Sequence, residues 1–140
     1  MKGVLTDPVV LIDTSVWIQL LNGRDPSLKQ EVEGLRVQRR ARLALPIVAE
    51  LLQGTKSEEE ERRILELEAK VPFLQELGDT WREAGRLSRR IRTQGQTVPL
   101  LDCYLAALAL GHGAAVFTLD KHFEPLRRAC GLELQPHSRI

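Results

Sequence analysis

Four acidic residues stand in stretches of this chain that otherwise favour burial. Asp13 ends the apolar run PVVLI, and Glu50 lies inside LPIVAELLQG. Asp102 interrupts VPLLDCYLAALAL, and Asp120 comes two residues after the run AAVFT. No Lys or Arg lies within four residues of Glu50, so no local salt bridge explains its position. A buried carboxylate is costly unless it is paired or binds a metal, which makes these positions candidates for chemistry.

Carboxylates that share one site repel one another and raise each other's pKa. A divalent cation removes that conflict, and a set of oxygen ligands points to Mg²⁺ or Mn²⁺ rather than to zinc. The three histidines are scattered and no Cys/His spacing resembles a zinc site. His122, two residues after Asp120, could lie near the site, but we expect it to be a surface histidine. Magnesium held by carboxylates suits phosphoryl chemistry, because it activates water and neutralises a departing oxygen.

Each acid also has a purely structural explanation. Asp13 and Asp102 could cap the helices that follow them, and Asp120 could cap a helix or begin a turn. Glu50 is a weak cap in the middle of a segment, so its alternative is an ion pair with a residue elsewhere in the fold. We favour one shared site, since four separate explanations are needed otherwise.

The elements that must position these acids are short strands that alternate with helices. Strands are expected at 9–12, 43–45, 114–118 and 132–134. Helices are expected after Thr14 or Ser15 as far as Asn22-Gly23, then over about 26–40, 46–54, 58–70, 77–95, 102–113 and 121–130. The apolar positions of the helix over 77–95 include Trp81, which we expect in the core. Alternation of this kind predicts a parallel α/β sheet with helices on both faces, and in such sheets ligands bind beyond the carboxyl ends of the strands.

Length and composition fit one ordinary globular domain. The chain has 140 residues, a net charge of +1, 43% hydrophobic residues and 28% charged residues. The small net charge excludes general attraction to polyanions. No apolar run approaches 18 residues, and MKGVLTDP lacks the apolar region of a signal peptide, so we expect a cytoplasmic protein.

Three segments together resemble a known family. LIDTSVWIQLL, LPIVAELLQG and DCYLAALALGHGAAVFTLDKHFE span nearly the whole chain in the order found in PIN-domain ribonucleases, specifically in the VapC toxins of VapBC toxin–antitoxin pairs. The resemblance implies a single PIN domain over residues 1–140, an α/β/α sandwich with a parallel sheet of four to five strands. It also implies a homodimer, and inhibition by a small cognate antitoxin whose tail enters the groove of the active site.

The resemblance also implies a site and an activity. Asp13, Glu50, Asp102 and Asp120 match the acids that hold Mg²⁺ or Mn²⁺, while Ser15 and Thr118 match polar positions that support the first and the last acid. In related sequences the last acid varies in place; some have Asn at the position of Asp120 and an acid two residues later, where this chain has His122. The implied activity is hydrolysis of RNA phosphodiester bonds by metal-activated water, leaving a 5′-phosphate on one product.

Other functions remain open on the sequence alone. Arg86, Arg89 and Arg90 are candidates for binding RNA phosphates, but they also fit a solvated helix face or a contact with an acidic antitoxin segment. A phosphatase of the haloacid-dehalogenase type would have Asp-x-Asp after the first strand, where this chain has Asp13-Thr14-Ser15. A receiver domain would have its acceptor Asp at a strand end in mid-chain and a late Lys. A non-catalytic PIN-like scaffold that binds RNA or protein is the main alternative.

Overall fold

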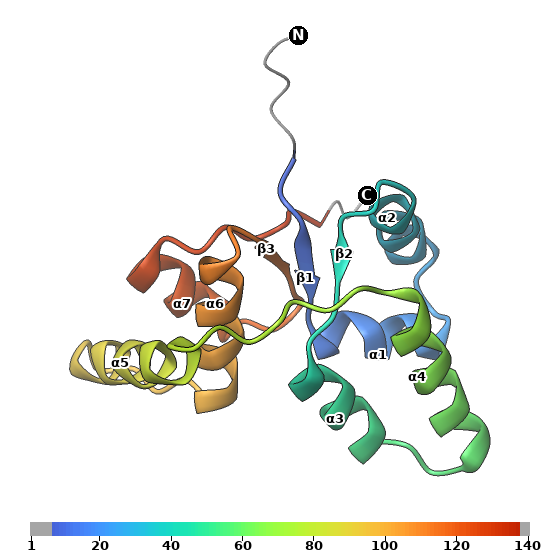
Figure 1. Ribbon diagram of the computed structural model, residues 1–140, viewed down its shortest axis with the longest axis horizontal. Helices are drawn as coiled ribbons and strands as arrows, with labels where there is room; N and C mark the ends of the chain where they lie inside the picture. Colours follow the sequence, from blue (N-terminus) through green and yellow to red (C-terminus); the bar gives the residue numbers. More distant parts are fainter. Residues whose placement is uncertain (1–6, 138–140) are drawn as a thin grey trace, which may run out of the picture.

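The computed structural model describes residues 7–137 and has a short parallel sheet at its centre (Figure 1). Its strands are β1 (Val10–Ile12), β2 (Ala41–Arg42) and β3 (Ala115–Phe117), in the order β2-β1-β3. All residues of β1 and β3 are buried, as expected for strands covered on both faces. Residues 1–6, most of the MKGVLTDP segment in which no signal peptide is expected, lie outside the described residues.

The sheet is narrower than the four to five strands that were expected. Within residues 7–137 only three strands form, and two more segments reach the sheet through one parallel bridge each, Leu43 to Phe73 and Val116 to Leu134. The strand predicted at 132–134 is reduced to the second of these bridges. A single bridge leaves most backbone groups of a segment free to bond elsewhere, so these segments extend the sheet without forming strands.

The second strand lies two residues earlier than predicted. It occupies Ala41–Arg42 instead of 43–45, because helix α3 (Leu45–Gln53) already begins at Leu45. Pro46 lies in the first turn of that helix, where backbone N–H groups have no partner within the helix. Proline has no N–H, and its fixed φ angle suits a helix start.

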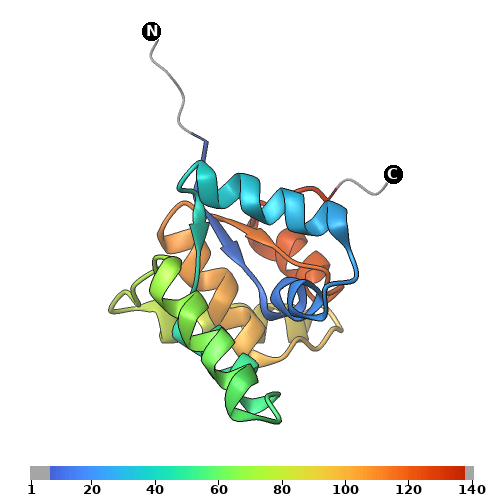
Figure 2. The ribbon, with the colours of Figure 1, turned by 90° about the vertical axis from the view of Figure 1, so that its right-hand side faces the viewer.

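Seven helices in the described part of the chain cover the sheet on both faces, which confirms the predicted α/β/α sandwich. Figure 1 shows α5, α6 and α7 beyond β3, and Figure 2 shows α2 and α4 in front of the sheet with α6 behind it. None of the helices within residues 7–137 is long and apolar enough to cross a membrane. Besides α3 they are α1 (Thr14–Asn22), α2 (Pro26–Val37), α4 (Glu58–Lys70), α5 (Thr80–Thr93), α6 (Leu100–Gly111) and α7 (Phe123–Cys130).

The junction between β1 and α1 is held by main-chain bonds. The N–H of Asp13 donates to the carbonyl oxygen of Phe117 at 2.9 Å, which ties the end of β1 to β3. The indole N–H of Trp17 donates to the carbonyl oxygen of Ile12 at 2.9 Å within the core. These bonds fix the backbone on both sides of the Asp13 carboxylate.

The predicted cap of α1 was wrong by one or two residues. Asp13 occupies the N-cap position but makes no side-chain capping bond, and Thr14 and Ser15 lie inside the first turn. Their hydroxyls bond to acidic side chains instead of capping the helix. At the other end Gly23 adopts a left-handed conformation with φ of 67°, which confirms the predicted stop.

Trp81 is not a core residue, contrary to the prediction. Helix α5 begins at Thr80, so Trp81 lies in its first turn and 47% of it is exposed. One face of its ring stacks on Tyr104 of α6, with ring centroids 4.1 Å apart. Helical spacing identified the correct side of α5, but the first turn extends past the elements that would cover it.

Candidate metal centre

Asp13 is the most buried of the four acids. It lies at the carboxyl end of β1 with 5% of its surface exposed. Its Oδ2 atom accepts hydrogen bonds from the hydroxyls of Ser15 and Thr118, both at 2.8 Å. Because both bonds end on one oxygen, Oδ1 is free to meet another ligand. The carboxylate is therefore fixed in orientation through Oδ2, and Oδ1 is available as a ligand.

The two hydroxyls beside Asp13 also hold the loop that follows β3. Ser15 Oγ accepts from the N–H of Leu119 at 2.9 Å, and Thr118 Oγ1 accepts from the N–H of Asp120 at 2.9 Å. Ser15 and Thr118 thus connect the end of β1 to the segment that carries the last acid. Both residues were proposed from the sequence as supports of the acids, and the structure places them in contact with Asp13.

Glu50 faces the same site from helix α3. It is partly buried, and its Oε1 accepts a hydrogen bond from the hydroxyl of Thr14 at 2.7 Å. Within residues 7–137 no Lys or Arg forms an ion pair with it. The ion pair that was the structural alternative for Glu50 is thus not found there.

Asp102, Asp120 and His122 form the exposed side of the site. His122 Nδ1 lies 3.4 Å from Asp102 Oδ2 and 3.3 Å from Asp120 Oδ1. One ligand atom from each of the three residues lies within 4.8 Å of the other two. The side chain of His122 is 51% exposed, as expected for a surface histidine, yet its ring faces two of the acids. The sequence raised His122 as a neighbour of the site only through its place two residues after Asp120, and favoured a surface histidine.

The other three acids act electrostatically on the carboxyl of Asp102. Burial raises the pKa of its carboxyl to about 6, and the charges of Asp13 and Asp120 add to that increase. Glu50 raises the same pKa further, and His122 opposes it. The sequence prediction that clustered carboxylates raise each other's pKa is therefore met at Asp102.

The donor set fits a divalent cation. Asp102 and Asp120 group with His122, Asp13 and Glu50 lie near enough to raise the pKa of Asp102, and among the described residues no Lys or Arg makes an ion pair with any of the four acids. The hydroxyls of Thr14 and Ser15 donate hydrogen bonds to Glu50 and Asp13. These bonds fix the two carboxylates, as supporting groups fix the ligands of metal sites. A cation with a preference for oxygen ligands would replace the missing positive charge.

The three candidate RNA-binding arginines lie on α5 and differ in their surroundings. Arg86 pairs with Asp79 at 3.2 Å and with Glu83. Arg90 donates to the carbonyl oxygen of Ala129 at 3.3 Å, and Arg89 is exposed. Arg86 is thus largely neutralised by acids of its own helix, which makes Arg89 the more available cation of the three.

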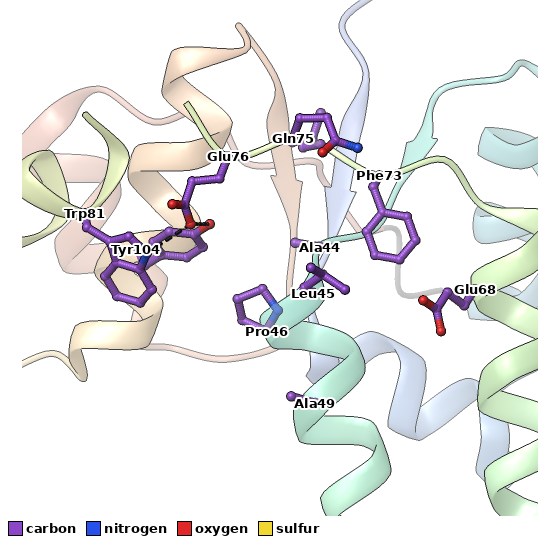
Figure 3. A pocket seen from close by; sticks show the side chains of 11 residues that line it. Ala44, Leu45, Pro46, Ala49, Glu68, Phe73, Gln75, Glu76, Trp81 and Tyr104 are labelled. Atoms are coloured by element: carbon purple, nitrogen blue, oxygen red, sulfur yellow. Dashed lines mark hydrogen bonds between the residues drawn. The ribbon is translucent and has the colours of Figure 1, made fainter. Parts of the chain in front are cut away.

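A pocket of about 570 Å³ adjoins the helix that carries Glu50 (Figure 3). Its lining is mostly apolar and includes Leu45 and Pro46 of α3, while Trp81 and Tyr104 stack at one end. Glu76 Oε1 accepts from the indole N–H of Trp81 at 2.9 Å and from the hydroxyl of Tyr104 at 2.7 Å. This arrangement holds the exposed Trp81 ring in place beside the pocket.

Comparison with known proteins gives consistent matches. The family model for the PIN domain matches residues 10–129. Ribonuclease VapC11 of Mycobacterium tuberculosis is 32% identical over 130 residues, covering 89% of this chain and 96% of that protein.

Among solved structures, VapBC-1 from nontypeable Haemophilus influenzae superposes with a TM-score of 0.77 at 22% identity, covering 94% of this chain and 99% of that one. VapBC-5 of Mycobacterium tuberculosis, a member of the VapBC family of toxin–antitoxin systems, gives a TM-score of 0.64 at 25% identity, with 91% and 98% covered.

Proposed function

The chain belongs to the PIN domain family, and on that premise we propose that it is a metal-dependent endoribonuclease, the toxin of a type II toxin–antitoxin pair. The observation that carries the proposal is the convergence of four carboxylates without a paired Lys or Arg in the described chain. The relative named as a ribonuclease and the neighbour from a toxin–antitoxin system support the choice of RNA and of an antitoxin partner. We place its action in the cytoplasm.

Each residue of the site has a defined task in this proposal. Asp13, Glu50 and Asp102 hold the metal, and Asp120 holds it directly or through water. A bound Mg²⁺ or Mn²⁺ supplies the acidity that activates a water and the charge that offsets the departing oxygen. Ser15 and Thr118 fix the orientation of the Asp13 carboxylate that would hold the metal, and Thr14 does the same for Glu50.

The direct test is cleavage of end-labelled total RNA by protein that has been freed of any co-purified partner. We expect cutting with Mn²⁺, none with EDTA, and 5′-phosphate ends on one product of each cut. Full activity in EDTA would contradict metal dependence. If the protein binds RNA and Mn²⁺ but cleaves no RNA from any of several sources, the alternative of a non-catalytic PIN-like scaffold is supported.

We further propose that the chain forms a homodimer through the face that contains the pocket beside α3. Leu45 is 67% exposed at the rim of this pocket and Trp81 is 47% exposed at its end. Large apolar side chains gathered around one hollow are typical of surfaces that a partner covers, and Trp is enriched in such interfaces. The remaining lining, which includes Pro46 and Phe73, is also apolar.

Leu45→Glu is expected to convert the dimer into a monomer. The change puts a charge into the apolar face, while its position at the start of α3 keeps the acid compatible with the helix dipole. Light scattering after size exclusion should give about twice the chain mass of 15.8 kDa for the wild type and the single mass for the variant.

A matched control is Val37→Lys, which charges another exposed apolar residue at the end of α2 and also suits its dipole. This control should remain dimeric. A monomeric wild type, or two variants that dissociate equally, would exclude the pocket face as the dimer interface.

A further inference from the structure

We propose that His122 is a ligand of the metal and that its imidazole makes the site select Mn²⁺ over Mg²⁺. The inference rests on the proposed metal-dependent function and adds a nitrogen to a ligand set that the sequence predicted to be all oxygen. It concerns only which atoms surround the ion and which ion they favour.

The positions of the three outer side chains fit neighbouring ligands of one ion. Two ligands that bind an octahedral ion at right angles, each at about 2.1 Å, lie ~3.0 Å apart. His122 Nδ1 lies 3.3 Å from Asp120 Oδ1 and 3.4 Å from Asp102 Oδ2. One ligand atom of each of the three residues also lies within 4.8 Å of the other two, as a shared ion requires.

The ring makes no hydrogen bond of ordinary length to either acid. Hydrogen bonds between N–H and oxygen usually measure about 2.7–3.2 Å, and both contacts of His122 Nδ1 lie just beyond that range. The ring is also half exposed, so a simple ion pair with the two acids would add little to stability. A role as counter-ion would therefore stabilise the fold little, which favours a role as a metal ligand.

The backbone aims His122 and Asp120 in the same direction. The N–H of His122 donates to Asp120 Oδ1 at 2.9 Å, a tight turn closed by the aspartate side chain. The N–H of Asp120 is in turn held by Thr118, whose hydroxyl also bonds Asp13. The imidazole is thus connected through two residues to the most buried carboxylate of the site.

A nitrogen ligand changes the preference of the site. Mg²⁺ selects oxygen ligands in near-ideal octahedral geometry, so an imidazole in the ligand set disfavours it. Imidazole nitrogen suits transition-metal ions, above all Zn, Cu, Fe and Ni, and Mn²⁺ is the transition-metal ion of the two proposed for this site. The expected result is tighter binding of Mn²⁺ relative to Mg²⁺.

The test is electron spin-echo spectroscopy of Mn²⁺ bound to the metal-free, full-length protein. We expect the nitrogen modulation of a directly coordinated imidazole in the wild type and its loss in His122→Ala. Competition between Mg²⁺ and Mn²⁺, followed by the signal of free Mn²⁺, should show the ratio of the two affinities shifted toward Mg²⁺ by about 10-fold or more in His122→Asp.

The matched control is His112→Asn, which removes a histidine that contacts the carbonyl of Gln75 elsewhere in the fold. It should keep the nitrogen modulation and the affinity ratio. Bound Mn²⁺ without imidazole modulation in the wild type, or an unchanged ratio in His122→Asp, would overturn the role of His122 while leaving the metal site intact. Failure of the proposed function gives a different result. In that case the wild type either binds no Mn²⁺, or binds Mn²⁺ that Asp13→Asn does not remove.

Discussion

Asp13→Asn is expected to reduce RNA cleavage by at least about 100-fold, because loss of groups that merely support metal ligands already costs about 10–100-fold. It should also abolish the thermal stabilisation of the protein by Mn²⁺. The metal-free variant, in contrast, should be at least as stable as the wild type. This combination distinguishes a metal ligand from an acid that only holds the fold together.

The reason lies in how the Asp13 carboxylate is bonded. Both protein hydrogen bonds, from Ser15 and Thr118, end on Oδ2. The carbonyl oxygen of an asparagine can accept both of them, which places its NH₂ group where Oδ1 faced the other acids. The variant keeps the structural bonds, removes one negative charge from the cluster and replaces one metal-facing oxygen with a donor.

Thermal melts with and without Mn²⁺, together with the RNA cleavage assay, measure all three effects. Glu33→Gln is a suitable control, since Glu33 is an exposed acid that pairs with Arg36 on α2 and contacts none of the candidate RNA-binding arginines. The control should cut RNA and respond to Mn²⁺ like the wild type. The proposed role of Asp13 would be wrong if Asp13→Asn melted at a lower temperature without metal and still gained full stability from Mn²⁺.

The position of the acids could be predicted because it follows from strong sequence signals. The runs before Asp13 and Asp120 are apolar and short, which marks buried parallel strands, and the carboxyl ends of such strands share one edge of a sheet. Glu50 and Asp102 were identified from carboxylates inside apolar helices. The structure places Asp102 beside Asp120 and His122, and Asp13 and Glu50 near enough to raise the pKa of Asp102 through their charges.

The direction of individual side chains could not be predicted in the same way. The exposure of Trp81 depends on where α5 begins and on what covers its first turn, and neither follows from helical spacing. The ring of His122 faces the site because the Asp120 side chain closes a turn with its backbone. The extra strand predicted at 132–134 is a single bridge at Leu134, which does not differ in sequence from a short strand.

The metal-free protein is expected to lose stability as the pH rises from about 4 to about 6, through the ionisation of Asp102. Its pKa is about 6 in the folded protein against 3.8 for the model group, so the folded state holds this proton more tightly. Stability therefore falls as pH rises through this window and stays low above it. A shift of this size corresponds to a loss on the order of 3 kcal/mol, and the side chain is only 14% exposed, so little of it is screened.

Urea unfolding of the wild type and of Asp102→Asn, at pH values between 4 and 8, isolates this contribution. Asparagine imitates the protonated acid, so the variant should gain stability over the wild type as pH rises. Asp13, Glu50, Asp120 and His122 also act on Asp102 through their charges, but they are present in both proteins. A stability difference that is flat with pH, or that favours the wild type at pH 7, would contradict the raised pKa.

Saturating Mn²⁺ should reverse the trend in the wild type. Protons and metal compete for the same carboxylates, so stabilisation by Mn²⁺ grows as Asp102 ionises and reaches about 2.7 kcal/mol when the free ion is 100 times its dissociation constant. Asp102→Asn should lack most of this gain. The charge repulsion that weakens the empty site near neutral pH is thus the same interaction that a bound cation relieves, which explains why the fold tolerates four acids at one edge of its sheet.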